Sequence, residues 1–377
     1  MRLLPVLLLR LALLVAMSAS AALIVDYANA GDPAFCGVTS GCFAVRMSGH
    51  AYLFGYIPMP QLGLAAFSAL FGIAFVARNR LQHAVVAAIA ALGGLFALYL
   101  LWLQNAVIGA LCPWCVAVDS SAIIAAVSAA WVWHSSRKDE ASVRLPALPR
   151  VAWAWVVAAL VGIIAPFIWG LFPAEPPMPD AIKREQVPDK LTIVGFTDFE
   201  CPFCRRLHPE LHKIVEQNNG RVVLVRKMAP LSGHLGAEPA ALVWLCTPEN
   251  LREAVADKLY TAPPDKLTPE GTIILAATAG VDAAELSMCV KSPETRAKLE
   301  ADKKLLDELG GRGLPFTFVG KRVVLGANLD GLKTAVAREL SGEKHPALPV
   351  WAMFALIGAA FVGAIVVTVA ADSKRST

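Results

Sequence analysis

Charged residues are scarce in this sequence. Only 17% of its 377 residues are Asp, Glu, Lys or Arg, whereas 56% are apolar, and this balance excludes an ordinary water-soluble protein. The chain is also too long for a single domain. We therefore expect a multi-domain protein with a membrane part and a soluble part.

Groupings of metal ligands are lacking as well. The seven histidines show no spacing that is typical of a metal site, and we expect them at the surface or at helix ends. No metal is therefore expected.

Long apolar runs fill much of the chain. Six runs have about the 20 residues that a transmembrane helix needs: Leu3–Val25, Tyr56–Ala77, Ala84–Leu103, Leu111–Trp133, Val151–Phe172 and Val350–Ala371. One polar stretch, from about 175 to 346, is long enough to bury its own core. The expected organisation is a four-helix transmembrane domain at 1–135, a cytoplasmic link and fifth helix at 136–172, a Pro-rich linker at 173–190, a soluble domain at 191–345 and a sixth helix at 349–371.

Basic residues cluster beside the ends of these runs, at Arg2, 78–80, 137–150 and 374–375. The positive-inside rule accounts for these clusters, so the net charge of +4 gives no reason to expect a nucleic-acid partner. With the clusters in the cytoplasm, both termini lie inside and the polar domain lies outside. The first run is either a cleaved signal peptide or a retained helix. Arg10 in its middle favours the retained helix.

All eight cysteines fall at positions that this topology places outside the cytoplasm: Cys36, Cys42, Cys112, Cys115, Cys201, Cys204, Cys246 and Cys289. Disulfides persist in oxidising compartments, so an even number of cysteines on that side predicts disulfide chemistry. A relay that carries electrons outward would need cysteines within the spans or at the cytoplasmic face. The sequence has none there, which argues against that alternative.

The soluble domain alternates strand and helix patterns. Short β-rich runs lie at 191–197, 221–226, 316–319 and 322–325, and helical patterns fill most of 234–309. This order predicts an α/β domain with a helical insert.

The motif Cys201-Pro-Phe-Cys204 lies where the first strand of this domain meets a helix. A helix N-terminus stabilises a thiolate and lowers its pKa. We therefore expect Cys201 to be the exposed, attacking cysteine and Cys204 to resolve the mixed disulfide. The alternative, half of a zinc site, lacks a second pair of ligands at a suitable spacing.

Three further cysteine pairs have different settings. Cys112-Pro-Trp-Cys115 opens the fourth span at its outer end. Cys36 and Cys42 lie in the loop after the first span, as either a structural disulfide or an exchanging pair. Exchange is favoured because transfer requires one thiolate to reach the sulfur of another pair.

The fourth pair, Cys246 and Cys289, lies in the helical insert. It is either a second redox pair or a structural disulfide between two helices. The structural role is favoured because no Cys-x-x-Cys turn activates either residue, and a disulfide across such a long loop stabilises the fold by about 3 to 5 kcal/mol.

Residues 196–204, together with the downstream Gly313-Leu314-Pro315, resemble the DsbA-like branch of the thioredoxin superfamily. The resemblance implies a thioredoxin-like domain in which Pro315 follows a cis peptide bond, faces the Cys-x-x-Cys pair and helps to hold the backbone of the substrate. Leu314 departs from the Thr or Val that is commoner in relatives, which leaves the substrate preference open.

The membrane part resembles the vitamin K epoxide reductase family. The matching features are a cysteine pair after the first span, a serine six residues on, the run Gly55-Tyr-Ile-Pro58 and a Cys-x-x-Cys at the head of the fourth span. DsbB-type quinone reductases carry their pairs in the reverse order. The resemblance implies that Cys42 receives electrons from the thioredoxin-like domain, Cys36 passes them to Cys112, and Cys115 faces a quinone, either ubiquinone or menaquinone.

Two further residues are candidates for the quinone site. The resemblance associates Ser48 with it. Asp119 stands where some relatives have Tyr, and Met59 where some have Asn, so not all quinone contacts carry over. An ionisable residue one turn into a membrane helix is costly and usually functional. Asp119 therefore either supplies protons to the quinone or lies close enough to the surface to be hydrated.

Taken together, these features predict a quinone-dependent thiol-disulfide oxidoreductase of the bacterial cytoplasmic membrane. Its expected clients are reduced secreted or periplasmic proteins. The alternative is a membrane-tethered chaperone or binding module whose cysteines are structural.

Overall fold

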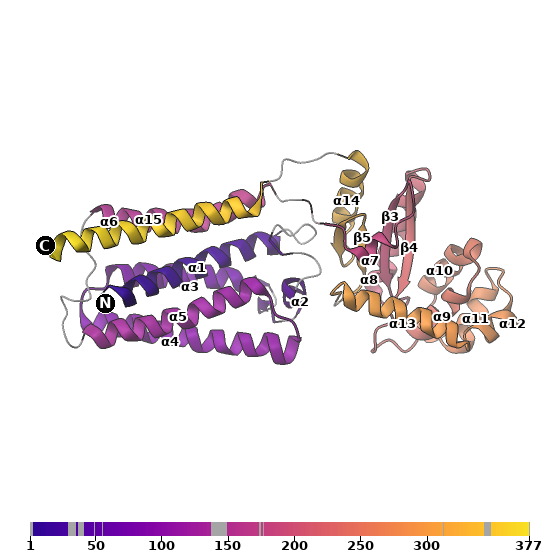
Figure 1. The fold of residues 1–377 in the computed structure, drawn as a ribbon. Helices are drawn as coiled ribbons and strands as arrows, with labels where there is room; N and C mark the ends of the chain where they lie inside the picture. The colour runs from indigo at the N-terminus through magenta and orange to yellow at the C-terminus, as the bar shows by residue number, and fades with distance from the viewer. Residues whose placement is uncertain are drawn as a thin grey trace. The chain divides into compact units, whose positions relative to one another are not determined.

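The computed structural model describes residues 3–28, 35–36, 41–48, 50–54, 56–136, 149–172, 175, 177–311, 313–342 and 348–376. The chain divides into two compact units (Figure 1). Unit 1 comprises Met1–Glu175 and His345–Thr377, and unit 2 comprises Pro176–Lys344.

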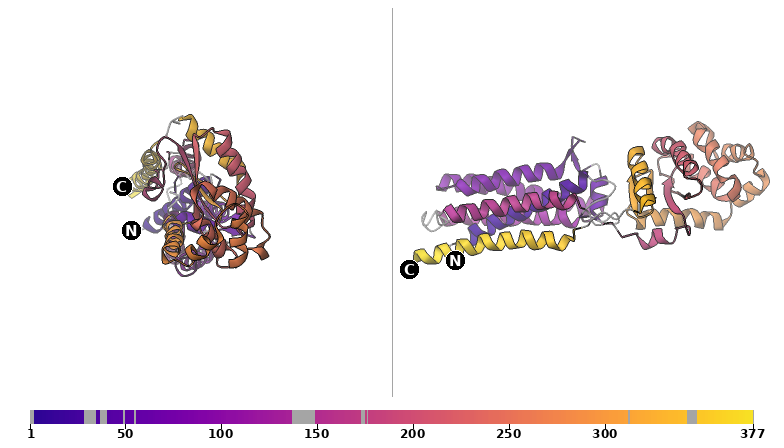
Figure 2. Two further views of the ribbon diagram at one scale, coloured as in Figure 1. Left: turned by 90° about the vertical axis from the view of Figure 1, so that its right-hand side faces the viewer. Right: turned by 90° about the horizontal axis from the view of Figure 1, so that it is seen from above.

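Unit 1 is a bundle of apolar helices. Six described helices are long and apolar enough to cross a membrane, and they coincide with the six predicted runs within a few residues. They are α1 (Leu4–Ala28), α3 (Met59–Val76), α4 (Arg80–Trp102), α5 (Pro113–Ser136), α6 (Pro149–Gly170) and α15 (Val350–Ser376). Helix α1 packs against α3, α5 and α6, and α15 lies alongside α6 (Figure 2).

The packing of α15 fixes the place of the sixth helix within unit 1. Trp155 of α6 is fully buried, and its Nε1 donates a 3.0 Å hydrogen bond to Oγ1 of Thr368 on α15. Phe354 of α15 stacks on Trp114, with ring centroids 5.7 Å apart. Helix α15 therefore belongs to the same core as the preceding helices.

Short elements occupy the end of unit 1 where α1 ends and α5 begins. They are the helix α2 (Gly41–Met47), the antiparallel strands β1 (Tyr52–Leu53) and β2 (Ile57–Pro58), and the π-helix η1 (Leu103–Ile108). The apolar runs predicted from the sequence end at Leu103 and resume at Leu111, which left residues 104–110 as a short connection between two spans. The π-helix extends α4 instead and ends at Gly109, whose φ of 68° favours glycine.

Unit 2 is built on a four-stranded sheet of order β4-β3-β5-β6. The strands are β3 (Leu191–Thr197), β4 (Val222–Met228), β5 (Phe316–Val319) and β6 (Arg322–Leu325). Strands β3 and β4 are parallel, whereas β5 pairs antiparallel with both β3 and β6. Two helices, α8 (Pro202–Gln217) and α14 (Leu329–Ser341), pack on the sheet.

The helical insert lies between β4 and β5. It contains α9 (Ala237–Cys246), α10 (Arg252–Thr261), α11 (Pro269–Ala277), α12 (Ala283–Cys289) and α13 (Pro293–Glu308), with short 3-10 turns at Glu249–Leu251 and Pro264–Lys266. The predicted fold class, a helical bundle plus an α/β domain with a helical insert, is confirmed.

The second half of the expected linker is part of unit 2. Helix α7 (Asp180–Lys183) lies within it, and its Ile182 is fully buried. Glu185 forms a 2.9 Å ion pair with Lys227 of β4. The polar and Pro-rich composition concealed these two anchoring side chains.

Candidate active sites

The Cys201–Cys204 pair stands at the start of α8. Strand β3 ends at Thr197, Cys201 caps α8, and Pro202 occupies its first turn, where a missing N–H costs nothing. Both cysteines are free thiols in this structure. Cys201 is only 3% exposed, so the prediction that it is exposed is wrong. The loop before β5 covers it.

That loop carries Leu314 and Pro315. The peptide bond between these two residues is cis. The carbonyl oxygen of Leu314 lies 4.0 Å from the Cys201 sulfur, and Pro315 lines a small cavity together with Cys204. The structure thus brings both predicted substrate-contacting residues to the cysteine pair.

The two thiols of this pair differ in acidity. A hydrogen bond from Cys204 lowers the pKa of Cys201 to about 6, and the backbone N–H groups of Phe203 and Cys204 contribute further. The same hydrogen bond, together with burial, raises the pKa of Cys204. Cys201 is therefore the thiolate of the reduced pair, and Cys204 holds the proton.

Asp198 holds the turn that precedes α8. Its carboxylate accepts hydrogen bonds from the backbone N–H groups of Glu200 at 2.7 Å, Cys201 at 3.2 Å and Leu231 at 3.0 Å. His234 lies 2.7 Å from the same carboxylate. Sequence reasoning did not single out Asp198, although an Asp three residues before a helix-capping cysteine is a signal that a turn needs an acceptor.

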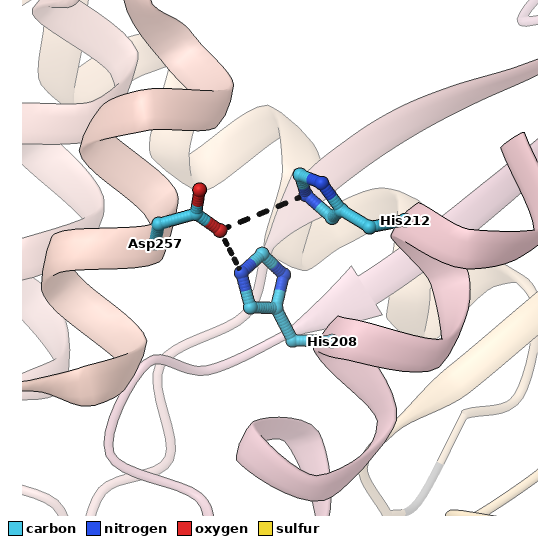
Figure 3. Close-up of side chains that lie close together, drawn as sticks. All are labelled: His208, His212 and Asp257. Carbon is cyan, nitrogen blue, oxygen red and sulfur yellow. Dashed lines mark hydrogen bonds and ion pairs between the residues drawn. The ribbon is translucent and has the colours of Figure 1, made fainter. Parts of the chain in front are cut away.

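His208 and His212 of α8 lie close to Asp257 of α10 (Figure 3). Their ligand atoms are within 4.8 Å of one another, which is close enough for a metal ion. His208 is 5% exposed, so the predicted surface position is wrong for this residue. Two of the three residues are one turn apart on α8, but Asp257 comes from α10, and local spacing does not reveal that contact.

A buried arginine makes this cluster unsuitable for a cation. Nη2 of Arg226 lies 3.0 Å from Nδ1 of His208 and can only donate. Nε2 of His208 must then carry the proton and donate to Asp257 Oδ1 at 2.7 Å, so neither nitrogen has a lone pair for a metal. Burial and the charge of Arg226 lower the pKa of His208 to about 4, so this ring is neutral at pH 7.

The remaining pair of unit 2 forms a disulfide. Cys246 at the end of α9 is bonded to Cys289 at the end of α12. The hydroxyl of Thr295 lies within 3.4 Å of both sulfur atoms. The bond therefore joins two helices of the insert, and its structural role stays a prediction.

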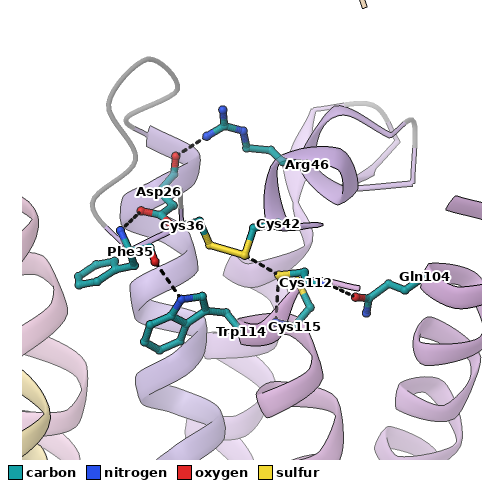
Figure 4. Close-up of a disulfide and its surroundings, with 9 residues drawn as sticks. All are labelled: Asp26, Phe35, Cys36, Cys42, Arg46, Gln104, Cys112, Trp114 and Cys115. Carbon is teal, nitrogen blue, oxygen red and sulfur yellow. Dashed lines mark hydrogen bonds between the residues drawn. A yellow bond between two sulfur atoms is a disulfide. The ribbon is translucent and has the colours of Figure 1, made fainter. Parts of the chain in front are cut away.

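Four cysteines gather at one end of unit 1 (Figure 4). Cys36 and Cys42 form a disulfide, and Cys112 and Cys115 are free thiols. The Cys112 sulfur lies 3.2 Å from the Cys42 sulfur, and the backbone N–H of Cys115 donates to Cys112 at 3.2 Å. The resemblance pairs Cys112 with Cys36, whereas the sulfur in contact is that of Cys42.

Close backbone packing holds these two pairs together. A Cβ atom at Gly41 would collide with the carbonyl of Leu111, so the helix that begins with Gly41 rests directly on the residue before Cys112. Nε1 of Trp114 donates to the carbonyl of Phe35 at 3.3 Å. Each loop cysteine therefore has a neighbour that is tied to the start of α5.

An apolar cavity of about 310 Å³ opens beside Cys115. Its lining includes Ser48, Met59, Gln104 and Asp119. Nε2 of Gln104 donates to Asp119 Oδ2 at 3.2 Å, and its Oε1 accepts the backbone N–H of Cys112 at 3.0 Å. The structure thus brings both predicted quinone-site residues to one cavity.

Gln104 is a residue that sequence reasoning missed. It lies in the π-helix and is buried. A single polar residue near the predicted end of a span carries no signal, because such positions are usually hydrated.

Comparison with protein families gives two matches. Residues 6–133 match the model of the vitamin K epoxide reductase family, and residues 189–337 match the thioredoxin model. Comparison with curated proteins found no match.

Several solved structures are similar to unit 2. A thioredoxin-like oxidoreductase from Silicibacter pomeroyi is 29% identical, covering 41% of this chain and 89% of that chain with a TM-score of 0.38. A periplasmic thioredoxin-like protein from Salmonella enterica serovar Typhimurium is 26% identical, covering 41% and 87% with a TM-score of 0.35. Oxidised BdbD from Bacillus subtilis is 20% identical, covering 41% and 90% with a TM-score of 0.37.

The family matches agree with the two cysteine sites. A vitamin K epoxide reductase domain and a thioredoxin domain in one chain support thiol-disulfide oxidoreductase activity, and the six apolar helices indicate a membrane protein. The chain therefore carries a vitamin K epoxide reductase family domain at residues 6–133 and a thioredoxin-like domain at residues 189–337.

Proposed function

We propose that this protein forms disulfide bonds in secreted or periplasmic proteins and passes the electrons to a quinone. The observation that carries the proposal is the 3.2 Å contact between the sulfurs of Cys42 and Cys112. It joins a disulfide to a dithiol that borders an apolar cavity. Thiol-disulfide exchange requires this kind of sulfur-to-sulfur approach.

The first step takes place at the Cys201–Cys204 disulfide. A client thiolate attacks the Cys201 sulfur, the bond between the two cysteines breaks, and Cys204 leaves as a thiolate. A second client thiolate then attacks the client sulfur of the mixed disulfide and releases Cys201. The client gains one disulfide, and the pair gains two electrons. The low pKa of Cys201 supports this step because a stable thiolate is a good leaving group.

The electrons then move to unit 1. The Cys201 thiolate attacks the Cys36–Cys42 disulfide at Cys42, and Cys204 resolves the mixed disulfide. The reduced loop pair next attacks the oxidised Cys112–Cys115 pair. The resemblance assigns this attack to Cys36, and the observed contact favours Cys42.

Attack on Cys112 by Cys36 and attack by Cys42 can be distinguished by trapping the mixed disulfide. In a Cys115→Ser chain, Cys112 has no partner within its own motif and attacks the loop disulfide. We expect a Cys42–Cys112 bond, identified by mass spectrometry of peptides under non-reducing conditions. A Cys36–Cys112 bond would support the order that the resemblance implies.

The final electron transfer leaves the Cys112–Cys115 dithiol as a disulfide. Two electrons and two protons pass to a ubiquinone or menaquinone beside Cys115. The apolar cavity of about 310 Å³ is large enough for a quinone ring. Asp119 and Ser48 border it, and we propose that Asp119 supplies protons to the acceptor.

We place the protein in the bacterial cytoplasmic membrane with its cysteines on the extracytoplasmic side. The four cysteines of unit 1 lie at the end where α6 ends and α15 begins, which is also where the chain leaves for unit 2 and returns from it. Arg78 and Arg80 lie at the opposite end, between α3 and α4. The positive-inside rule supports this orientation.

The test uses the full chain in lipid nanodiscs with a reduced client protein and a soluble quinone. We expect quinol to form only when the client is present, at one quinol for each client disulfide. The Cys246→Ala/Cys289→Ala chain is the matched control, because removal of a structural disulfide should leave turnover intact. Quinol that forms at the same rate without a client would contradict the proposal.

The same assay separates the enzyme from a binding module. A chaperone with structural cysteines would still protect its clients when Cys201 and Cys115 are both replaced by Ser. An oxidoreductase would lose client oxidation completely in that chain.

A further inference from the structure

A line of buried polar side chains runs from Cys204 into the interior of unit 2. Cys204 is 2% exposed, Thr197 6%, Tyr260 4% and Arg226 6%. The four residues come from α8, β3, α10 and β4. Four separate elements thus place polar groups at one point beneath the cysteine pair, where each needs a hydrogen-bond partner.

The four side chains line one small cavity. The hydroxyl of Thr197 is hydrogen-bonded to the hydroxyl of Tyr260 at 2.5 Å. Thr197 also opposes the rise that burial causes in the pKa of the Cys204 thiol. The guanidinium carbon of Arg226 lies 5.6 Å from the centre of the Tyr260 ring, and its charge opposes the rise that burial causes in the pKa of Tyr260.

The chemistry of these groups favours one direction for the chain. Arg226 has only donors, so toward the oxygen of Tyr260 it can only donate. Either hydroxyl can be the donor between Tyr260 and Thr197, and when Tyr260 donates, the proton of Thr197 is available for the sulfur of Cys204. In that arrangement every donor points toward that sulfur.

Arg226 itself is held in place. Its Nη2 donates to Glu253 Oε2 at 2.8 Å and to Nδ1 of His208 at 3.0 Å. Hydrogen bonds from His212 and Arg226 outweigh the burial of Glu253 and lower its pKa to about 2. The positive charge of Arg226, at the start of the donor chain, is thus held in place by its ion pair with Glu253.

We propose that Arg226, Tyr260 and Thr197 form a donor chain that stabilises the Cys204 thiolate while Cys201 is bonded to a client. In that state the sulfur–sulfur bond of the pair has broken, and Cys204 has left with the electron pair. Burial penalises the negative charge on the Cys204 sulfur. Cys201 carries no thiolate in this state, so it no longer accepts a hydrogen bond from Cys204. The donor chain supplies a hydrogen bond to the new Cys204 thiolate, and no proton is transferred.

Thr197 touches the reacting sulfur, whereas Tyr260 and Arg226 act as positioning residues. The inference rests on thiol-disulfide exchange at Cys201 and Cys204. It does not require the quinone, the loop pair or the direction of electron flow. Its failure can therefore be distinguished from failure of the proposed function.

The test measures the acidity of Cys204 in a full-length Cys201→Ser background, which imitates a Cys201 that carries no thiolate. The readout is the pH dependence of Cys204 alkylation, followed by mass spectrometry of its peptide. We expect Thr197→Val to raise the pKa of Cys204 by about one unit, since hydrogen bonds to charged groups are the strong ones. Tyr260→Phe should raise it by less.

Two further variants separate the chain from a general structural role. Thr197→Ser keeps the hydroxyl and should restore the original pKa. The Thr197→Val/Tyr260→Phe double variant should raise the pKa no further than Thr197→Val alone, because both substitutions break one chain. Additive shifts would overturn the proposal.

Thr317 provides the matched control. It is fully buried and lines the same small cavity as Thr197 and Cys204, yet its hydroxyl has no hydrogen-bond partner among the described residues. Thr317→Val should leave the pKa of Cys204 unchanged. An equal shift in this variant, or no shift in Thr197→Val, would overturn the proposal.

A kinetic measurement tests the same chain with both cysteines present. Dithiothreitol reduces the Cys201–Cys204 disulfide by the same attack that a client makes, with Cys204 as the leaving group. Thr197→Val should slow this reduction about threefold, as one unit of pKa gives with a Brønsted coefficient near 0.5. A rate unchanged from that of the unmodified chain would contradict the inference.

Discussion

The two Cys-Pro-aromatic-Cys motifs share a sequence pattern and a place in the fold, but their surroundings differ. Cys112 and Cys201 each stand immediately before a helix that begins with Pro. Cys112 lies 3.2 Å from the Cys42 sulfur and beside an apolar cavity. Cys201 lies against the carbonyl of Leu314, and its partner Cys204 lines a small cavity together with Arg226.

This difference shows how one motif can serve two partners. The motif makes one thiol a nucleophile, because helix N-H groups and the second cysteine stabilise its thiolate. The packing around the motif then decides which sulfur or acceptor reaches it. In unit 1 that partner is a second cysteine pair of the same chain. In unit 2 the carbonyl of Leu314, before the cis-proline, lies next to Cys201, and we propose that this loop offers its backbone to a client.

The largest effect should come from removing one nucleophile at a time. Cys201→Ser and Cys112→Ser should each reduce client-driven quinol formation about a thousandfold or more, since each nucleophile is essential. With dithiothreitol as the electron source, Cys201→Ser should keep its quinol formation, because a small dithiol can reduce the loop pair directly. Cys112→Ser should lose it. If Cys201→Ser lost quinol formation equally with the client and with dithiothreitol, the two motifs would not differ in the electron donor that each one serves.

A smaller effect is expected from the packing that is special to unit 1. Gly41→Val would push α2 away from Leu111 and move Cys42 away from Cys112. A displacement of about 1 Å costs about a hundredfold in rate, so quinol formation should fall by about that factor with either electron donor. Gly72→Ala is the control, because a Cβ there meets nothing within 4 Å. Normal turnover in Gly41→Val would show that this contact does not position the pair.

The acidity of Cys201 gives a prediction for unit 2. With a pKa of about 6, its alkylation rate in the reduced chain should be constant above pH 7 and fall tenfold for each unit below pH 6. An ordinary cysteine with a pKa of about 8.5 would be alkylated about thirtyfold more slowly at pH 7 through its small thiolate fraction. Stopped-flow alkylation with mass spectrometry of the peptide measures this profile. A midpoint near 8.5 would contradict the assignment of Cys201 as nucleophile.

The smallest effect concerns the cavity in unit 1. Asp119→Asn keeps the size of the side chain but removes its acid, and we expect quinol formation to fall about tenfold with an altered pH profile. Ser121→Ala on the same helix is the control, since Ser121 is buried but does not border the cavity. An unchanged rate and pH profile in Asp119→Asn would show that it is not the proton donor.

The features that depend on local pattern could be predicted from the sequence. The strand Leu191–Thr197, the helix that begins after Cys201 and the six apolar helices are where the periodicity and the breakers put them. The motifs also identified Leu314 and Pro315 beside the Cys201–Cys204 pair, but they did not identify Asp198 or Gln104. Helix propensity, hydrophobic runs and capping are properties of neighbouring residues, so they can be read along the chain.

Contacts between distant segments could not be predicted in the same way. Gln104 reaches Asp119 because a π-helix turns it inward. Tyr260 and Arg226 line one cavity with Thr197 because three elements converge beside α8. The spacing of residues along the sequence does not encode such contacts between distant segments. The burial of Cys201 was missed for the same reason, since the covering loop comes from more than a hundred residues downstream.

The central claim is that electrons from a client reach the membrane pair through the chain's own cysteines. The most direct test gives the fully oxidised chain one equivalent of reduced client without oxygen or quinone, then labels free thiols and maps them by mass spectrometry. The account predicts that free thiols accumulate at Cys112 and Cys115 and that addition of quinone reoxidises them. A Cys112–Cys115 bond that stays oxidised while Cys201 and Cys204 are reduced would contradict it.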